Sequence, residues 1–326
     1  MYKLYDKRSF AYTTVIDREY RMNILITGAT GFIGRSLTAR LISEGHEITA
    51  WVRNKPRAES LLGTDINIIE QLEQLTNQHF DAVINLAGEP IADKRWTDSR
   101  KQALRNSRIS LTRELIACIN RLPEQPSVFL SGSAIGYYGS HDADIEITES
   151  FLPAATDVSD DFAHQLCKDW ETAALAIENR HTRVCLLRTG IVLGHNGGAL
   201  GKMLLPFRLG LGGPMGNGEQ VMSWIHLHDW IEAAMFLLNN PEASGAFNLV
   251  SPQAVSNSVF SRALAAAVHR PAFFSVPCVI MKVLMGESSS LLCEGQNILP
   301  DKLQSTGFNF TYNNINDAFR EIVSHL

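Results

Sequence analysis

Glycines at fixed spacing mark a phosphate-binding turn near the start of the chain, where residues 28–34 are GATGFIG. Without side chains, such a turn lets backbone N–H groups approach a phosphate, and a helix N-terminus behind it favours negative charge. The apolar run Asn23–Thr27 and the helical pattern after the turn provide the strand–turn–helix context that the motif requires. The turn therefore predicts a dinucleotide site. The residues assigned to it are Gly28, Thr30, Gly31, Phe32, Ile33, Gly34 and Arg35.

The segment after the second predicted strand indicates which dinucleotide binds. An acidic residue about 20 positions beyond the glycines would bind the 2′-hydroxyl of NAD. Here residues 51–57 are WVRNKPR, and no carboxylate follows until Glu59. A guanidinium binds a 2′-phosphate through charge-assisted hydrogen bonds, which a neighbouring carboxylate would oppose. We therefore predict NADP(H) as cofactor, with Arg53 on the 2′-phosphate, no carboxylate beside it, and Arg35 and Lys55 as helpers. A solvated basic loop is the alternative.

Alternating strands and helices position these residues. Period and composition predict strands over residues 23–27, 47–52, 81–87, 127–131 and 182–189. Helices are predicted over residues 35–43, 97–121 and 160–178. This alternation is typical of a parallel sheet covered on both faces. The fold class is therefore α/β, a Rossmann-type doubly wound parallel sheet.

The pattern changes after Gly190, where glycines and two prolines predict loops across a cleft, followed by helices near residues 228–238, 256–269 and 314–323. We predict an NADP-binding domain over residues 22–193, its sheet partly completed by later segments. Residues 194–326 are predicted to form a smaller, mixed α/β substrate lobe. Residues 1–21 have no continuous apolar stretch, so we expect an N-terminal appendage and no secretory signal, with a basic targeting arm as the alternative.

The composition limits the classes of partner that the protein is expected to bind. The net charge of -5 argues against a general affinity for nucleic acid or anionic membranes. No apolar run approaches the roughly 20 residues that span a bilayer. The 5 cysteines contain no CxxC pair, which predicts reduced thiols in a cytoplasmic protein. The expected partner is a small-molecule substrate, and a homodimer is left open.

Two histidines near the predicted cleft could suggest a metal. His226 and His228 alternate as strand residues do, so they are expected to face opposite sides. Neither has a nearby cysteine or carboxylate pattern typical of zinc. No metal site is predicted.

Several separated motifs resemble the extended short-chain dehydrogenase/reductases, the group that includes sugar-nucleotide epimerases. NLAG at residues 85–88, RTGIVLG at 188–194 and WIHLHD at 224–229 look like segments of that family. NLAGEPI at 85–91, Arg95-Trp96, Ser107-Arg108 and LLPFRLGLGG at 204–213 resemble an atypical subgroup called epimerase family proteins, which has an extra C-terminal domain. The resemblance implies NADP binding but no particular substrate. The contacts it implies beyond the glycine turn are Arg53, Leu86, Ala87, Gly88, Arg108, Ser131 and Val192.

The wider family uses a serine, a tyrosine and a lysine four residues after the tyrosine, whose ammonium lowers the tyrosine pKa for proton transfer. Ser133 fits the serine, but no tyrosine here has a lysine at that spacing. The resemblance places Ala163 and Cys167 at the tyrosine and lysine positions. Tyr137 and Tyr138 are therefore the alternative catalytic acids, with aromatic packing as the competing interpretation.

Another pair has the same spacing on the helix. His164 and Lys168 could form a displaced proton relay, although an ordinary exposed helical pair is the favoured interpretation. Arg95, Trp96 and Arg188 could bind an anionic or sugar-like substrate.

Two functions fit these residues. The first is an NADP-dependent, epimerase-like oxidoreductase acting on a small carbonyl or hydroxyl compound, nucleotide-linked compounds included. The second is an NADP(H)-sensing regulatory protein that works through a partner. The missing tyrosine–lysine pair favours the second, whereas Ser133 and the paired tyrosines favour the first, which we prefer.

Overall fold

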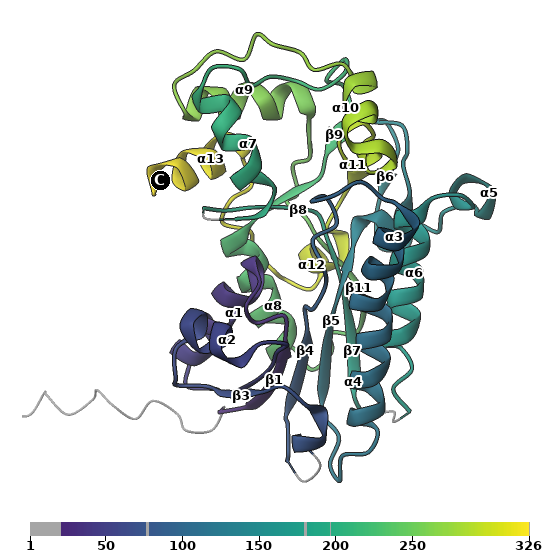
Figure 1. The fold of residues 1–326 in the computed structure, drawn as a ribbon, viewed down its shortest axis with the longest axis vertical. Helices are drawn as coiled ribbons and strands as arrows, with labels where there is room; N and C mark the ends of the chain where they lie inside the picture. The colour runs from purple at the N-terminus through teal and green to yellow at the C-terminus, as the bar shows by residue number, and fades with distance from the viewer. Residues whose placement is uncertain (1–20, 76–77, 179–180, 196, 326) are drawn as a thin grey trace, which may run out of the picture.

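A computed structural model describes residues 21–75, 78–178, 181–195 and 197–325. The predicted appendage over residues 1–21 lies outside them except for Arg21. A parallel sheet of 7 strands forms the base of the molecule, in the order β11-β7-β5-β4-β1-β2-β3 (Figure 1). The predicted α/β class is thus confirmed. The strands are β1 (Asn23–Thr27), β2 (Glu47–Trp51), β3 (Asn67–Ile69), β4 (Ala82–Asn85), β5 (Val128–Ala134), β7 (Arg183–Thr189) and β11 (Gly245–Leu249).

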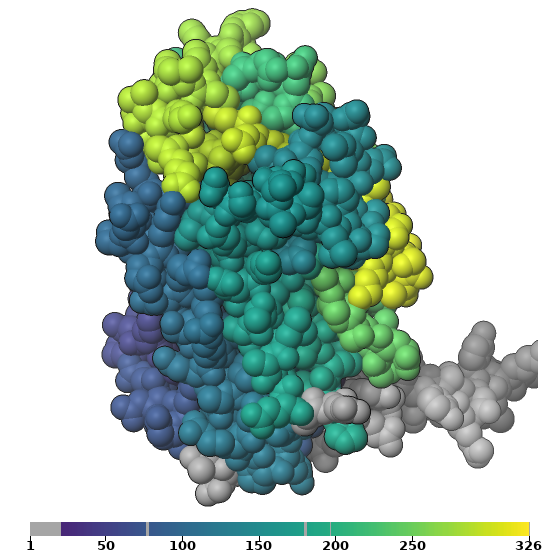
Figure 2. Space-filling model, turned by 90° about the vertical axis from the view of Figure 1, so that its right-hand side faces the viewer, coloured from purple at the N-terminus to yellow at the C-terminus, as the bar shows by residue number. Residues whose placement is uncertain are grey.

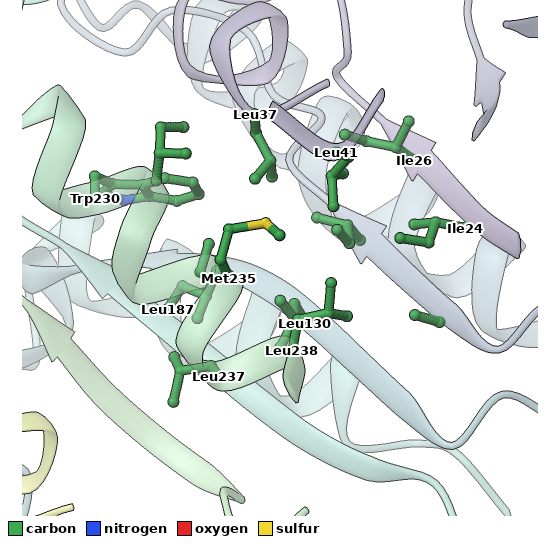
Figure 3. Packing of buried hydrophobic residues seen from close by; sticks show 14 of the residues in the cluster. Ile24, Ile26, Leu37, Leu41, Leu130, Leu187, Trp230, Met235, Leu237 and Leu238 are labelled. Carbon is green, nitrogen blue, oxygen red and sulfur yellow. The ribbon is translucent and has the colours of Figure 1, made fainter. Parts of the chain in front are cut away.

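Helices cover both faces of the sheet. One face packs against α1 (Phe32–Ser43), α2 (Lys55–Leu62) and α8 (Leu227–Asn239), and the other against α4 (Leu111–Ile119) and α6 (Phe162–Ala174). Side chains alternate along β1 accordingly. Ile24 and Ile26 join the cluster under α1 and α8 (Figure 3), whereas Leu25 joins the cluster under α4 and α6. Each strand is therefore buried on both sides, as the apolar runs in the sequence predict.

The strand order reverses between β1 and β4, because β2 follows on one side and β4 on the other. In open parallel sheets, ligands bind beyond the carboxyl ends of the strands at such a switch point. The glycine turn after β1 and the NLAG segment after β4 therefore meet at the position where a dinucleotide is expected.

The long helix predicted over residues 97–121 is interrupted. It consists of α3 (Asp98–Arg105), a π-helical segment η3 (Asn106–Ser110) and α4, which follow one another without a break. A π-helical turn carries one extra residue and frequently marks a functional site. Here it holds Ser107 and Arg108.

Short elements that periodicity did not predict complete the sheet domain. The basic segment after β2 is the start of α2, where Asn54 accepts a hydrogen bond from the Arg57 backbone as N-cap. Strand β3 has only 3 residues. The other short elements here are η2 (Leu72–Leu75), η4 (Ile135–Tyr138), β6 (Glu146–Ile147) and α5 (Ala155–Val158).

The C-terminal half forms a lobe above the carboxyl ends of the strands (Figure 1). Its core joins α7 (Gly198–Arg208), α9 (Asn257–Ala267) and α13 (Ile315–Ser324). Figure 2 shows the segment around α10 at the top of the molecule, above the sheet domain. The remaining elements are β8 (Ile191–Leu193), β9 (Val221–Met222), β10 (Trp224–His226), β12 (Val255–Ser256), α10 (Cys278–Met285), η5 (Gly286–Ser289), α11 (Ser290–Cys293), β13 (Asn297–Ile298) and α12 (Asp301–Ser305).

The two halves are interleaved in the sheet. Strand β11, from the later half, pairs with β7 and completes the main sheet. Within the described residues, no helix combines the length and apolar character needed to cross a membrane. The boundary predicted at residue 193 stays a prediction.

One expectation about the cysteines is wrong. Cys278 and Cys293, which flank the segment carrying α10, form a disulfide, whereas Cys118, Cys167 and Cys185 are buried free thiols. The sequence could not reveal this pair, because 15 positions separate its members and the fold alone brings them together. A cytoplasmic location inferred from reduced cysteines loses part of its basis and stays a prediction.

Candidate functional site

The glycine turn lies between β1 and α1. Gly28 has a φ of 72°, a left-handed conformation that favours glycine, and a Cβ there would lie 2.5 Å from the Leu86 backbone. A Cβ on Gly34 would lie 2.1 Å from the Gly28 carbonyl oxygen. Both positions therefore require glycine. The close approach brings the NLAG segment against the start of α1.

The start of α1 presents donors that have no hydrogen-bond partner among the described residues. Gly31 is the N-cap residue and makes no side-chain cap, which leaves the first-turn N–H groups open to an anion. The Arg35 Nε is buried and has no hydrogen-bond partner in the described part of the chain. Orphaned donors beside a positive helix end suit a pyrophosphate. The residues present thus fit the dinucleotide that the glycine pattern predicts.

Other residues of the turn have packing roles. The Phe32 ring lies under the loop after β8, where a Cβ on Gly197 would come within 2.5 Å of it. Ile33 packs against the core under α1, while Thr30 is half-buried and Gly31 exposed. The glycine-rich loop predicted to cross a cleft therefore closes onto the helix that begins at the turn.

Arg53 follows β2, and 84% of its side chain is exposed. Its Nη1 donates to Oε1 of Glu89 at 3.3 Å. The expectation that Arg53 has no carboxylate beside it is therefore wrong. Glu89 lies 36 positions further along the chain, in the segment after β4, so the segment after β2 could not reveal it. The predicted helper Lys55 donates its backbone N–H to Glu70 at 3.0 Å.

A buried polar network fixes the switch point. Thr27 Oγ1 donates to Asn85 Oδ1 at 2.7 Å, and Asn85 Nδ2 donates to Thr112 Oγ1 at 2.8 Å. Trp170 Nε1 also donates to Thr112 Oγ1, at 3.1 Å. The network ties the ends of β1 and β4 to α4 and α6, with its buried polar groups paired. The sequence analysis did not predict that Thr112 and Trp170 take part in this network. The polar Asn85 at the end of an apolar strand was nevertheless a sign that a buried hydrogen bond would be needed there.

Arg108 lies against the segment predicted to contact the cofactor. A Cβ on Gly88 would come within 3.0 Å of its guanidinium, and its Nη2 donates to the Glu89 carbonyl at 2.9 Å. The guanidinium also lies 5.3 Å from the Trp170 ring centroid, and burial lowers the pKa of Arg108. The π-helical turn therefore presses Arg108 onto residues 86–89, although contact with a cofactor stays a prediction.

The two serines lie on β5 and Val192 lies on β8. Ser131 stands beside Asn85 in the sheet register and is buried, as is Val192 on β8. Their predicted cofactor contacts remain predictions. Ser133 is also buried, and its Oγ donates to Glu171 Oε1 at 2.7 Å. The serine at the family position thus has an internal acceptor, which sequence reasoning missed.

The paired tyrosines differ. Tyr138 has no exposed surface; its hydroxyl donates to Asn248 Oδ1 at 2.7 Å and accepts from Arg188 Nη1 at 2.9 Å. Burial raises the pKa of Tyr138 to about 12. These contacts give Tyr138 a structural role, and its assignment as a catalytic acid stays a prediction. Tyr137 is half-buried, and among the described residues its hydroxyl has no hydrogen-bond partner.

The guanidinium of Arg188 is paired with a carboxylate of the same chain. Its Nε and Nη2 each donate to Glu171, both at 2.8 Å, and the two side chains are 6% exposed. The guanidinium also stacks on the Tyr137 ring, 3.5 Å from the centroid. This bidentate buried pair occupies the donors that a substrate would need. The expectation that Arg188 binds substrate stays a prediction.

The two other substrate residues also make internal contacts. Trp96 is 8% exposed, packs edge-on against Phe162 and donates from Nε1 to the Ile91 carbonyl at 2.9 Å. It belongs to a buried hydrophobic cluster, and its contact with a substrate stays a prediction. Arg95 is exposed and donates to the Val283 carbonyl on α10 at 3.3 Å. It joins the C-terminal lobe to the sheet domain, and a substrate contact stays a prediction.

Helix α6 carries neither member of the usual catalytic pair. Ala163 and Cys167 face Gly136 on η4, where a Cβ would lie 3.2 Å from Ala163 Cβ and 3.6 Å from Cys167 Sγ. Burial raises the pKa of Cys167 to about 12, so this thiol is no substitute base. The displaced pair is not an exposed one, because His164 is buried and its Nδ1 contacts the Tyr137 carbonyl, while Lys168 is exposed.

The histidines are arranged differently from the prediction. Strand β10 ends at His226, and His228 already belongs to α8, so strand alternation does not apply. Both rings contact Tyr312, and His226 Nδ1 accepts the His228 backbone N–H as the helix cap. No group of histidine, cysteine and acidic residues suited to a metal occurs in the described ranges.

Comparison with known proteins agrees with this geometry. Residues 24–250 match the NAD dependent epimerase/dehydratase family, and residues 276–322 match a domain of unknown function (DUF1731). The Arabidopsis thaliana chloroplastic homolog of epimerase family protein SDR39U1 is 36% identical over 323 residues, covering 97% of this chain and 91% of that protein. The Staphylococcus aureus epimerase family protein SAR0825 is 36% identical, and the match covers 92% of this chain and 98% of that protein.

A solved structure gives the same result. Human epimerase family protein SDR39U1 (isoform 2), crystallised with NADPH, superposes with a TM-score of 0.84 at 33% identity, covering 94% of this chain and 100% of that one. The parallel sheet, the glycine turn and the open start of α1 define an NAD(P)-binding Rossmann protein. The chain belongs to the NAD-dependent epimerase/dehydratase family, in which it resembles the epimerase family proteins of the SDR39U1 type.

Proposed function

We propose that the protein is an NADP(H)-dependent, epimerase-like oxidoreductase acting on a small carbonyl or hydroxyl compound, nucleotide-linked compounds included. The observation that carries the cofactor assignment is the exposed guanidinium of Arg53 at the end of β2, on the same sheet edge as the glycine turn. A cation there suits a 2′-phosphate. The NADPH in the crystals of human SDR39U1 supports the same choice.

The turn and the basic side chains would share the cofactor. The first-turn N–H groups of α1 and the unpartnered Arg35 Nε would hold the pyrophosphate, and Arg53 the 2′-phosphate. When bound, the nicotinamide supplies or accepts a hydride. The chain's own task is then to bind and orient the substrate and to handle one proton.

Tyr137 is our choice for the proton. Ser133 donates its hydroxyl hydrogen to Glu171, and Tyr138 is buried in hydrogen bonds to Asn248 and Arg188. The hydroxyl of Tyr137 has no partner within the described ranges, while its ring is fixed against Arg188. Tyr137 would therefore donate a hydrogen bond to a substrate carbonyl, which favours reduction over oxidation.

A second candidate function, NADP(H) sensing, is favoured by the residues at the positions of the usual catalytic pair. Positions 163 and 167 hold an alanine and a buried thiol, and Ser133 and Tyr138 have internal partners. A protein with an intact nucleotide site and impaired chemistry would act as an NADP(H) sensor through a partner. A screen of carbonyl substrates with NADPH separates the two functions, because a sensor binds NADPH tightly and consumes none.

The test of the cofactor assignment is Arg53→Ala. Losing one charge-assisted hydrogen bond costs roughly 1.5–3 kcal/mol, so NADP⁺ should bind about tenfold more weakly or worse. The affinity for NAD⁺ should change little, because its ribose has no 2′-phosphate. Titration calorimetry of both cofactors checks this. Equal affinity of the unaltered protein for NADP⁺ and NAD⁺ would contradict the assignment.

A further inference from the structure

Glu89 lies between two arginines from different parts of the fold. Its Oε2 accepts from Arg100 Nη1 at 2.9 Å, and its Oε1 accepts from Arg53 Nη1 at 3.3 Å. The hydrogen bonds from Arg100 and then from Arg53 lower the pKa of Glu89. An ionised carboxylate therefore touches the arginine to which we assign the 2′-phosphate.

The backbone of Glu89 is held at both ends. Its N–H donates to Ser107 Oγ at 3.1 Å, and its carbonyl accepts from Arg108 Nη2 at 2.9 Å. Both partners belong to the π-helical segment η3. These two contacts fix the backbone of Glu89, and the hydrogen bond from Arg100 holds its carboxylate near Arg53.

The two arginines are not equivalent. The Arg100 side chain is 10% exposed and also donates to the Pro90 carbonyl, whereas the Arg53 side chain is 84% exposed. An ion pair with such an exposed member contributes little to stability and is readily exchanged. Arg100 is therefore the lasting counter-ion of Glu89, and Arg53 is the member that can leave.

We propose that Glu89 is a specificity-determining residue that competes with the 2′-phosphate for Arg53 and so limits the preference for NADP(H) over NAD(H). This inference rests on the proposed function, in which Arg53 binds the phosphate. NADP(H) must displace the Arg53–Glu89 contact and place a second anion near the carboxylate. NAD(H) carries a 2′-hydroxyl in place of the 2′-phosphate, so it neither displaces the Arg53–Glu89 contact nor brings a second anion near Glu89.

The experiment is titration calorimetry of the full chain with NADP⁺ and NAD⁺ at fixed ionic strength. Glu89→Gln should bind NADP⁺ two- to fivefold more tightly, or about 0.4–1 kcal/mol at 1.4 kcal/mol per tenfold. NAD⁺ affinity should change by less than about twofold, and the gain should shrink at high salt, which screens exposed charges. Combined with Arg53→Ala, Glu89→Gln should have no effect. Glu59→Gln on α2 removes the same charge and should leave both affinities unchanged.

Each outcome decides one point. Unchanged or weaker NADP⁺ binding by Glu89→Gln, or an equal change for NAD⁺, overturns the role of Glu89. If Arg53→Ala alone leaves NADP⁺ binding unchanged, the proposed 2′-phosphate site fails and the role of Glu89 fails with it. If Glu89→Gln does not fold because Arg100 loses its counter-ion, Glu89→Asp replaces it. The shorter side chain keeps a negative charge in the segment beside the largely buried Arg100 and lengthens the contact of 3.3 Å with Arg53. The same tighter NADP⁺ binding is therefore expected, and its absence would contradict the role of Glu89.

Discussion

Adjacent tyrosines have separate roles in this site. The hydroxyl of Tyr138 joins Asn248 on β11 to Arg188 on β7, while the hydroxyl of Tyr137 has no partner among the described residues. The ring of Tyr137 is nevertheless fixed, because Arg188 stacks on it and Glu171 holds Arg188. One buried ion pair thus supports both Tyr138 and Tyr137, the tyrosine that we propose as the proton donor.

Tyr138→Phe should destabilise the protein. The change leaves Asn248 and Arg188 buried with an unpaired polar group each, which typically costs about 1–3 kcal/mol. Urea unfolding followed by circular dichroism measures the loss. Tyr137→Phe is the matched control and should leave the free energy of unfolding nearly unchanged, because its hydroxyl makes no hydrogen bond in the described part of the chain. Equal losses for the two variants would contradict the division of roles.

The amino-acid sequence predicted only some of the residues in this site. The glycines lie between β1 and α1 and Arg53 follows β2, as the strand and turn patterns predicted, since those placements depend on local spacing. Ser133 was assigned through the family resemblance, and its catalytic role stays a prediction. The partners Glu89, Glu171 and Thr112 come from segments 36, 38 and 27 positions away, respectively, from the residues they contact. Arg188 and Trp96 were predicted to bind substrate because an arginine or tryptophan shows no sign of burial in the sequence alone.

At the scale of elements, the glycine turn depends on distances that only backbone atoms can share. The turn brings the Gly28 carbonyl, the start of α1 and the Leu86 backbone together. A side chain at any of these contacts would separate the end of β4 from α1. The pyrophosphate site between them would then lose its geometry.

Gly34→Ala tests this contact. The new Cβ would lie 2.1 Å from the Gly28 carbonyl oxygen, so the turn must shift. We expect at least about tenfold weaker NADP⁺ binding, and overpacking of this kind typically costs about 1–3 kcal/mol of stability. Gly201→Ala in α7 is the matched control, since nothing lies within 4 Å of its added Cβ. That variant should bind normally and gain about 0.5–1 kcal/mol. Calorimetry and urea unfolding check both, and normal NADP⁺ binding by Gly34→Ala would refute the steric argument.

Long amphipathic elements could be predicted, and short or irregular ones could not. The helices over 160–178 and 228–238 correspond to α6 and α8 because their apolar periodicity spans several turns. The π-helical turn within 97–121 was missed, since one extra residue hardly changes the pattern. Strand β3 has only 3 residues, and helix α2 is short and largely polar, so neither produces a periodic signal.

At the scale of the whole molecule, the order of strands determines where the site lies. The switch point between β1 and β4 could be expected from a doubly wound sheet. The C-terminal lobe could be recognised only by its change in composition. Its attachment to the sheet domain, through Arg95 with Val283 and Lys101 with Glu287 at 2.6 Å, depends on pairings that sequence spacing does not indicate.

The proposed cofactor would contact the segments after β1, β2 and β4 together, so its binding should stabilise the whole sheet domain. A ligand at one hundred times its Kd adds about 2.7 kcal/mol to the free energy of unfolding. For a chain of this size, roughly 2 °C in Tm per kcal/mol gives a rise of about 5 °C with NADP⁺. NAD⁺ at the same concentration should raise the Tm less, because Arg53 gains no phosphate. Scanning calorimetry makes the measurement, with Gly34→Ala as the variant that should show a clearly smaller shift, because its binding of NADP⁺ is weaker. Equal shifts with both cofactors would mean that the 2′-phosphate makes no net contribution to binding. A Gly34→Ala protein that responds like the original would place the nucleotide elsewhere than the glycine turn.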